Sequence, residues 1–304
     1  MARKNEARKQ HTVTKQILRE FVDDYDNDQG KLSVFERARR QRQLRTPGSG
    51  VFKTTFDAYA PNKTEGFWNQ FETNFPQILT RIRNRDDAPF VGADADLIRD
   101  MVAMHWLRSR AIMNVRDTAG ETVSAKLHAR LMTEQRSALA FEVMRRTGNA
   151  DPSSTELADM GWRLIEESRR TVVPKLHYDR NPEYFAHARK RVRELHLSIR
   201  YTASGDLAIG DAPVITTIGD DPRAAGPHQN VGILKTDYVA MPIGPHALAV
   251  LSERTDNSEL GAADVFRCNE LQWSTFVVWV AAKPDGFADQ RLRDEAKKPP
   301  AMGF

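Results

Sequence analysis

The segment Leu197-Ser198-Ile199-Arg200-Tyr201 marks the point at which this chain of 304 residues changes character. Its apolar residues alternate with polar ones, which is the period of a half-buried β-strand. The stretches 207–217 and 238–252 that follow it are rich in Val, Ile and Pro and are typical of further strands. We therefore expect a small, mainly antiparallel sheet late in the chain.

Helical patterns precede this segment. Apolar residues recur there at steps of three and four positions, as on one face of an amphipathic helix. Ser153-Ser154-Thr155-Glu156 is a capping-box pattern directly before such a stripe and gives the clearest helix start. We expect helices over residues 13–22, 67–83, 96–115 and 123–146, from 153 onward, and over 182–196.

Together these patterns predict an α+β fold in which a mostly helical middle region packs on the late sheet. A turn-bounded strand at 31–36 is expected to join the same sheet. We expect a single domain over residues 1–282, with the helical part over about 67–196 and the sheet part over about 197–282 plus 31–36. The long polar stretch 219–232 is expected to be a loop, and the charged residues 283–304 a disordered tail.

The composition is that of an ordinary globular protein, with 40% hydrophobic and 28% charged residues. No run approaches the roughly 18 consecutive apolar residues of a membrane helix, and the N-terminus lacks the apolar stretch of a secretory signal. The single cysteine, Cys268, allows no internal disulfide and no cysteine-based zinc site, which agrees with a reducing compartment. We therefore expect a soluble, cytoplasmic protein with no membrane partner.

The basic excess of the chain lies at its N-terminus. Residues 1–45 hold 12 Lys/Arg and 7 Asp/Glu, so the totals of 45 and 41 leave 33 and 34 for the rest. The densest part carries Arg37, Arg39, Arg40 and Arg42, whose guanidinium groups suit phosphates. Residues 1–45 are therefore a candidate surface for nucleic acid or another polyanion, although a solvated loop explains the same charges without a ligand.

Two short segments, His11 to Phe21 and Ile209 to Val214, stand out together. The first has the pattern His-x6-Leu-Arg-x-Phe, and the motifs Leu107-Arg-Ser-Arg110 and Met241-Pro-Ile-Gly-Pro245 follow along the chain. This succession resembles the uncharacterised bacterial family called domain of unknown function 4238 over nearly the whole chain. The resemblance points to four residues, His11, Arg19, Asp211 and Pro213, and it implies no settled activity.

These residues suggest a catalytic set. His11 can act as a general acid or base, Arg19 can contact an anion, and Asp211 can orient His11 or help to hold a metal. Each also has a structural explanation: a hydrogen bond at a helix start for His11, an ion pair for Arg19, and a turn braced through backbone N–H groups for Asp211. We expect the N-terminal helix to pack beside the strand that ends at Asp211 and to bring His11 and Asp211 together.

Arg108, Arg110 and Glu72 are the candidate substrate-binding residues. The two arginines end a helix, where the dipole alone also favours positive charge, and Glu72 lies beside an aromatic stripe or on a solvated rim. No cofactor is identified, and a divalent metal has weak support because no His-x3-His or Cys-x2-Cys spacing occurs. The absence of a Walker or dinucleotide glycine loop and of a Gly-x-Ser-x-Gly elbow disfavours NTPases, dehydrogenases and serine hydrolases.

The sequence supports two functional hypotheses. The first is a phosphate-directed hydrolase, of the nuclease or phosphoesterase type, with His11, Arg19 and Asp211 as catalytic residues. The second is a non-catalytic module that binds nucleic acid or another polyanion through its basic N-terminal region. A purely structural polar network that joins the first helix to the late sheet would explain the same residues.

Overall fold

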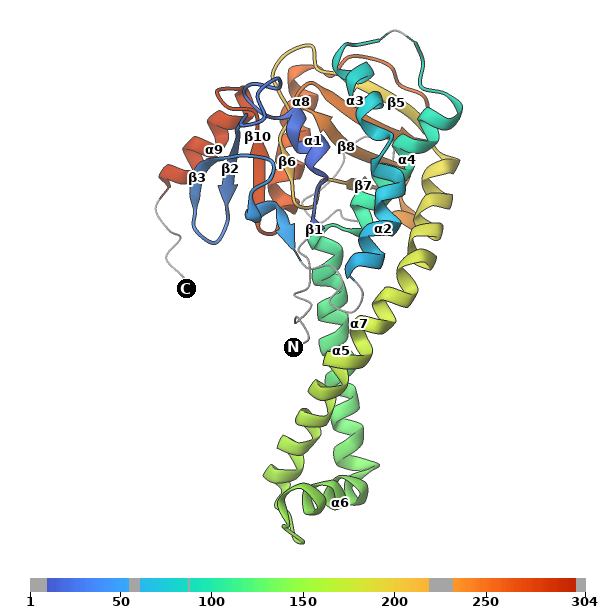
Figure 1. Cartoon of the computed structure of the whole chain (residues 1–304), viewed down its shortest axis with the longest axis vertical. Coiled ribbons are helices and arrows are strands. Elements are labelled where there is room, and N and C mark those ends of the chain that lie inside the picture. The colour runs from blue at the N-terminus through green and yellow to red at the C-terminus, as the bar shows by residue number, and fades with distance from the viewer. Residues whose placement is uncertain (1–9, 55–60, 87, 219–231, 299–304) are drawn as a thin grey trace, which may run out of the picture.

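The computed structural model describes residues 10–54, 61–86, 88–218 and 232–298 (Figure 1). The helices are α1 Lys15–Glu20, α2 Pro61–Glu72, α3 Phe75–Arg83, α4 Gly92–Leu107, α5 Arg110–Thr133, α6 Arg136–Thr147, α7 Ser154–Glu194, α8 Ala262–Thr275 and α9 Phe287–Lys297. The strands are β1 Gln10–His11, β2 Leu32–Glu36, β3 Gln41–Arg45, β4 Lys53–Thr54, β5 His196–Tyr201, β6 Ile209–Gly210, β7 Ile215–Thr217, β8 Tyr238–Gly244, β9 Ala247–Ser252 and β10 Trp279–Ala282.

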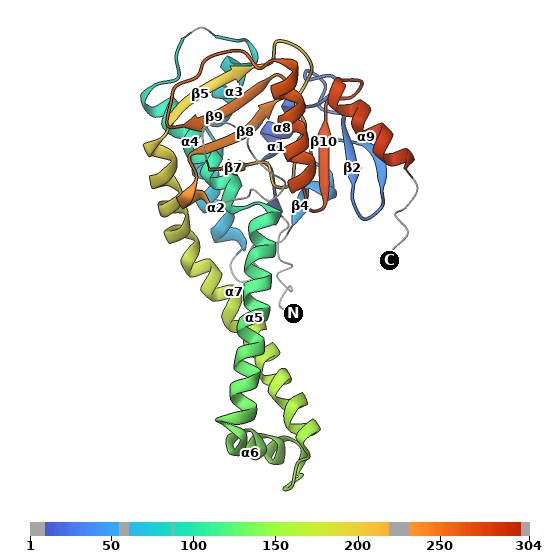
Figure 2. The same ribbon diagram turned by 180° about the vertical axis from the view of Figure 1, so that it is seen from behind.

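The molecule consists of a head, which holds the strands, and a helical arm that projects from it (Figures 1 and 2). The arm is built from α5, the first part of α7 and, at its far end, α6. The predicted capping box is present, since the hydroxyl of Ser153 accepts from the N–H of Glu156 and the Glu156 carboxylate accepts from the N–H of Ser153. The helices predicted from 153 and over 182–196 form one helix, α7, whose 41 residues span about 60 Å at 1.5 Å per residue.

The head contains two four-stranded sheets and one two-stranded sheet, and the pairs between named strands are antiparallel. The strand orders are β3-β2-β10-β6, β5-β9-β8-β7 and β1-β4. The predicted α+β class, with a helical middle and a late sheet, is confirmed. The N-terminal strand β2 pairs with the late strand β10, as expected, although the late strands divide between two sheets.

The sheet β5-β9-β8-β7 is buried on both faces. Alternate residues of each strand therefore pack against different helices. On β8, Val239 and Met241 pack into the main core with α1 and α4, whereas Tyr238 and Ala240 pack against α8. Successive side chains on a strand point to opposite faces, so a helix on each side yields this division. The β8–β9 sheet is therefore clamped between α8 and the N-terminal helices.

The short helix α1 packs on β8 and α3. Its apolar residues Ile17 and Leu18, and Phe21 just beyond it, are fully buried in the main core. The two ends of α1 consequently hold fixed positions, Lys15 at the N-terminal end and Glu20 at the C-terminal end, and each end borders a cavity described below.

The expectation of a disordered tail over 283–304 is wrong for Phe287–Lys297, which form α9. Ala288 and Leu292 of this helix are buried in a cluster with Val280 of β10. The carboxylate of Asp289 is fully buried; burial opposes its ionisation, but hydrogen bonds led by the one from Arg42 outweigh this and lower its pKa to about 2. Residues 299–304 lie outside the described residues, as do residues 219–231 of the expected loop.

No helix in the described part of the chain combines the length and the apolar character that crossing a membrane requires.

Candidate functional site

A cavity of about 190 Å³ lies where β1, β4, α1, α2 and the end of α4 meet. The figures show this region at the point where the arm leaves the head (Figures 1 and 2). Three of the six predicted site residues, His11, Glu72 and Arg108, line it. The other lining residues are Gln10, Thr14, Lys15, Lys53, Trp68 and Asn69.

The protonation state of His11 follows from its surroundings. His11 lies on β1 opposite Lys53 of β4, and its Nε2 is 3.2 Å from the carbonyl oxygen of Pro47. A carbonyl oxygen can only accept a hydrogen bond, so we assign the ring hydrogen to Nε2, which leaves a lone pair on Nδ1. Burial and then the charge of Lys53 lower the pKa of His11 to about 4, with Arg108 and Lys15 adding to the shift. The imidazole is therefore neutral at pH 7.

Two lysines supply positive charge to this cavity. Lys15 begins α1 and Lys53 lies on β4, and neither forms an ion pair with any residue that the structure describes. Both lower the pKa of His11, which places their charges close to the imidazole. The cavity is thus prepared for an anion.

Arg108 fixes one wall of the cavity. Its guanidinium donates to Oε1 of Glu72 at 2.7 Å and to the backbone oxygen of His11. The Glu72 carboxylate offsets the charge of Arg108, and the bond to His11 ties the end of α4 to β1. Arg108 and Glu72 therefore position His11 as well as line the cavity.

Thr14 and Trp68 carry buried polar atoms that face no protein partner. The hydroxyl oxygen of Thr14 and the indole Nε1 of Trp68 find no hydrogen-bond partner among the described residues, and both residues are almost completely buried. Buried polar groups normally have a hydrogen-bond partner, so an atom without one needs an explanation. Each of these atoms exposes less than 1 Å² of surface, so neither is open to the cavity that the two residues line.

His105 supports the site from beneath and was not singled out by sequence. Its Nε2 accepts the backbone N–H of Thr14 at 3.1 Å, and its Nδ1 donates to the Met101 oxygen at 2.7 Å. Complete burial, followed by the charge of Arg108, lowers the pKa of His105 to about 3, so the ring remains neutral. The sequence offered no signal for this role, because a histidine on an apolar helix face is common in cores and its partner Thr14 is 91 residues away.

Asp211 lies elsewhere and has a structural role. Its carboxylate oxygens accept the N–H groups of Val277 and Val278, each at 2.7 Å, at the junction between α8 and β10. Complete burial raises the pKa of Asp211 to about 6, and the two N–H groups and Arg110 oppose this rise. Asp211 does not line the His11 cavity, so the predicted roles of orienting His11 or holding a metal there do not fit this geometry. Turn bracing, the structural alternative, describes what it does.

The neighbouring Gly210 is held equally closely. The Gln272 side chain accepts the N–H of Gly210 at 2.8 Å and donates to the Pro213 oxygen at 2.7 Å. A Cβ at Gly210 would lie 3.1 Å from Cβ of Phe276 and 3.2 Å from Oε1 of Gln272. The Gly210 to Pro213 segment is therefore fixed by α8.

Arg19 and Arg110 also lie outside the cavity. The guanidinium of Arg19 pairs with Asp28 at 3.1 Å, donates to the Tyr25 oxygen at 3.3 Å and lies over the Tyr25 ring. The backbone N–H of Arg110 donates to the Asp211 oxygen at 3.1 Å. The structural alternative for Arg19, an ion pair, is what the structure contains.

The four arginines expected to bind nucleic acid lie on and beside the β2–β3 hairpin, and each already has a partner. Arg37 donates to the Phe276 oxygen, Arg39 pairs with Glu36, Arg40 lies 3.8 Å from Glu295, and Arg42 pairs with Asp289. Guanidinium groups engaged in this way are less available to phosphates than a solvated basic loop would be. The hairpin is tied to α9 through two of these pairs.

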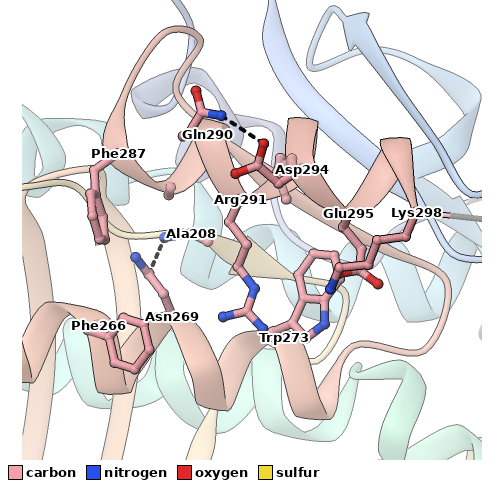
Figure 3. Close-up of a pocket in the computed structure, with 12 residues that line it drawn as sticks. Ala208, Phe266, Asn269, Trp273, Phe287, Gln290, Arg291, Asp294, Glu295 and Lys298 are labelled. Carbon is pink, nitrogen blue, oxygen red and sulfur yellow. Dashed lines mark hydrogen bonds and ion pairs between the residues drawn. The ribbon is translucent and has the colours of Figure 1, made fainter.

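A further cavity, of about 310 Å³, lies between α8 and α9 and is shown in Figure 3. Phe266, Trp273 and Phe287 give it an apolar lining. Its Arg291 lies 4.8 Å from the Trp273 ring centre and pairs with Glu270. Because its main cation is already paired, this cavity is a weaker candidate for a phosphate than the one at His11.

The residues that the structure describes contain no group of three or more His, Cys, Asp or Glu side chains arranged to hold a metal ion.

Comparison with known proteins identifies the family. The model of the family described as "Protein of unknown function (DUF4238)" matches residues 9–285, nearly the whole chain, so the chain belongs to this family. No curated protein and no solved structure matches the chain. The resemblance expected from the sequence motifs is thereby confirmed.

Proposed function

We propose that this member of the DUF4238 family is a phosphate-directed hydrolase whose active site is the cavity at His11. One observation carries the proposal: the imidazole of His11, whose Nε2 is 3.2 Å from the carbonyl oxygen of Pro47, lies among the cations Lys15, Lys53 and Arg108. A neutral imidazole beside an anion-binding wall combines a base with a place for the substrate charge.

The chemistry needs few steps. Lys15 and Lys53 hold the non-bridging oxygens of a phosphodiester, and water gives a proton to Nδ1 of His11 as its oxygen bonds to phosphorus. The ester P–O bond on the opposite side breaks, and the leaving oxygen departs as an alkoxide or phenolate that solvent protonates. Lysine charges close to the phosphoryl group stabilise the charge that develops in the transition state.

The remaining wall residues position the reacting groups. Trp68 and Thr14 line the cavity and shape the space beside His11. Arg108 holds the backbone of His11, and Glu72 holds Arg108. Arg19, Arg110 and Asp211, which the sequence favoured, take no part in this mechanism.

The alternative of a non-catalytic polyanion-binding module is weaker. It depends on Arg37, Arg39, Arg40 and Arg42, and all four guanidinium groups have partners within the head. The buried single thiol, Cys268, is compatible with a cytoplasmic setting, where we place this activity.

The direct test is turnover of bis(p-nitrophenyl) phosphate, RNA and DNA by the full chain, with and without Mg²⁺ or Mn²⁺. We expect His11→Gln to reduce turnover by about 10²–10⁴-fold, the usual contribution of a general base. The matched control is His196→Gln, because His196 is exposed at the start of β5 and does not line the cavity. Absence of turnover by the parent protein, or equal turnover by His11→Gln, would refute the proposal.

Two lysine variants test substrate binding separately from the chemical step. Lys53→Met should raise KM and leave the fold unchanged, because Lys53 is only half-buried and forms no ion pair with a described residue. Lys126→Met, at an exposed position of α5, is the control. Equal KM values for these two variants would remove Lys53 from the site.

A further inference from the structure

Two motifs from opposite ends of the chain meet at a second cavity, of about 210 Å³, at the C-terminal end of α1. Glu20 comes from the first motif, and the second supplies Gly244, the last residue of β8, and Pro245 in the turn to β9. The two motifs touch, since a Cβ at Gly244 would lie 3.7 Å from Cβ of Glu20. The hydrolase proposed above makes no use of this meeting point.

A buried carboxyl group lies at this cavity. The side chain of Glu20 is only 6% exposed, and both its oxygens face one nitrogen of Arg83, at 3.1 and 3.4 Å. Burial raises the pKa of Glu20 to about 7, and Arg83 and Arg19 oppose the rise. The group therefore holds a proton for part of the time at neutral pH, which is unusual for a carboxyl group beside an arginine.

Cations and an apolar wall complete the cavity. Lys283, just after β10, is half-buried and forms no ion pair with any described residue. Arg85 lies over the Tyr201 ring, and its pair with Glu259 is long, at 3.7 Å, and well exposed on both sides. Tyr201 and Pro245, which are half-buried, provide apolar surface, whereas Leu79 and Ile82 behind them are almost completely buried.

The cavity contains positive charges that no buried carboxylate of the described residues neutralises, so it can accept an anion. Arg83 and Glu20 largely satisfy each other, and the Oδ1 atom of Asp23 accepts two backbone N–H groups at 2.8 Å. Arg85 donates to the carbonyl oxygen of Thr202 at 3.2 Å, and the carboxylate that pairs with it, that of Glu259, is exposed. Lys283 forms no ion pair with any residue that the structure describes. Arg83 on α3 and Arg19 on its own helix act on Glu20. The other titratable or charged residues that line the cavity are Asp23, Tyr25, Arg85, Tyr201, His246 and Lys283.

We propose that this second cavity binds a small amphiphilic anion, with a phosphate or carboxylate head held by Lys283 and Arg85 and an apolar body against Tyr201 and Pro245. Glu20 takes up a proton as the ligand binds, because a new negative charge near a carboxylate disfavours its ionised form. Ligand binding at this site is thereby coupled to pH around neutrality.

The probes are phenyl phosphate and benzoate, which share an apolar ring and differ in the head group. Isothermal titration calorimetry of the full chain at pH 7, in two buffers of different ionisation enthalpy, yields both the affinity and the protons taken up. We expect one or both probes to bind with net proton uptake, and the stronger of the two identifies the head group. Binding of neither probe would overturn the inference.

Matched variants locate the binding. Lys283→Met and Arg85→Gln should each weaken binding about tenfold or more, whereas Lys297→Met, at a well-exposed position of α9, should not. Glu20→Gln should retain binding and lose the proton uptake. Unchanged affinity in both Lys283→Met and Arg85→Gln, or undiminished proton uptake in Glu20→Gln, would contradict the inference.

Two further variants distinguish this inference from the proposed hydrolase. Lys53→Met and His11→Gln alter the first cavity, which the proposed hydrolase would also offer to phenyl phosphate. These variants should therefore bind benzoate as the parent protein does and should keep the phenyl phosphate binding that is accompanied by proton uptake. Loss of this binding in Lys53→Met would show that the anion enters the first cavity. That outcome would refute the second site and leave the hydrolase standing.

Discussion

The backbone N–H of Arg110 donates a hydrogen bond to the carbonyl oxygen of Asp211 at 3.1 Å. Two residues earlier, the side chain of Arg108 donates to the carbonyl oxygen of His11. The junction between α4 and α5 therefore holds both of the distant segments that the sequence singled out. The segments are connected through this junction, and the carboxylate of Asp211 serves α8 and β10 instead of His11.

Asp211→Asn should destabilise the fold by about 1–3 kcal/mol, because an amide offers one acceptor oxygen and leaves one buried N–H group facing an NH2 group. Turnover should be little changed, since Asp211 does not line the His11 cavity. Urea unfolding of the two proteins, read with the same optical probe, measures the difference. A large loss of turnover at unchanged stability would restore Asp211 to the active site.

The pH dependence of that difference follows from the raised pKa of Asp211. Between the unfolded value near 4 and the folded value of about 6, the folded state binds more protons than the unfolded state. The stability contributed by Asp211 is therefore complete below pH 4 and is lost as the pH rises through 6. The penalty of Asp211→Asn should be greater at pH 5 than at pH 8, and the opposite order would contradict this account.

His105→Phe should destabilise the protein by about 1–3 kcal/mol, because the buried N–H of Thr14 loses its acceptor. The pKa of His105 is lowered in the folded state, so its contribution is present above pH 6.5 and is lost as the pH falls toward 3. Unfolding measured between pH 4 and 8 should show a shallower loss of stability on acidification in the variant than in the parent. Parallel curves would show that His105 does not titrate on unfolding.

The low pKa of His11 can be measured without any substrate. Titration of the histidine ring signals by NMR, with His11→Gln to assign the resonance, should place its pKa near 4. Lys53→Met removes the second-largest cause of the shift and should raise this pKa, and Lys126→Met should leave it unchanged. A pKa near 6.5 in the parent protein would contradict the burial and the neighbouring positive charges to which the low pKa is ascribed.

Leu292→Ala tests the role of α9. Leu292 is 1% exposed, and removal of a buried leucine side chain costs about 2–5 kcal/mol. We expect a loss of this size in urea unfolding, whereas Lys297→Ala on the exposed side of α9 should change stability by less than about 0.5 kcal/mol. Equal stabilities would mean that α9 does not pack on the sheet.

The sequence predicted those parts of the fold that depend on local periodicity. The alternation at Leu197 to Tyr201 forms β5, and the capping box at Ser153 begins α7. The prediction of a disordered tail was wrong for a physical reason. The apolar residues that α9 buries, Ala288 and Leu292, are small or widely spaced, and the many charged residues around them obscure the apolar pattern in the sequence. The proline at 182 predicted a helix start, yet α7 continues through it.

The site was predictable only in part. His11, Arg108 and Glu72 were expected, and the structure places them on one cavity. Lys53 and Trp68 were missed because no local pattern relates them to His11, and their proximity depends on the pairing of β1 with β4 and on the packing of α2. Pairings of this kind join residues about 40 or more positions apart, beyond the reach of helical or strand periodicity.

The pH dependence of kcat/KM for bis(p-nitrophenyl) phosphate tests the central claim most directly, because it reports the ionisation of the base in the free enzyme. With His11 as a base whose pKa is about 4, kcat/KM should remain level as the pH falls from 7 to about 5 and decline only near 4. The decline should disappear in His11→Gln together with most of the activity. A decline centred near pH 6.5 would contradict the low pKa of His11, and the same profile and rate in His11→Gln would contradict its assignment as the catalytic base.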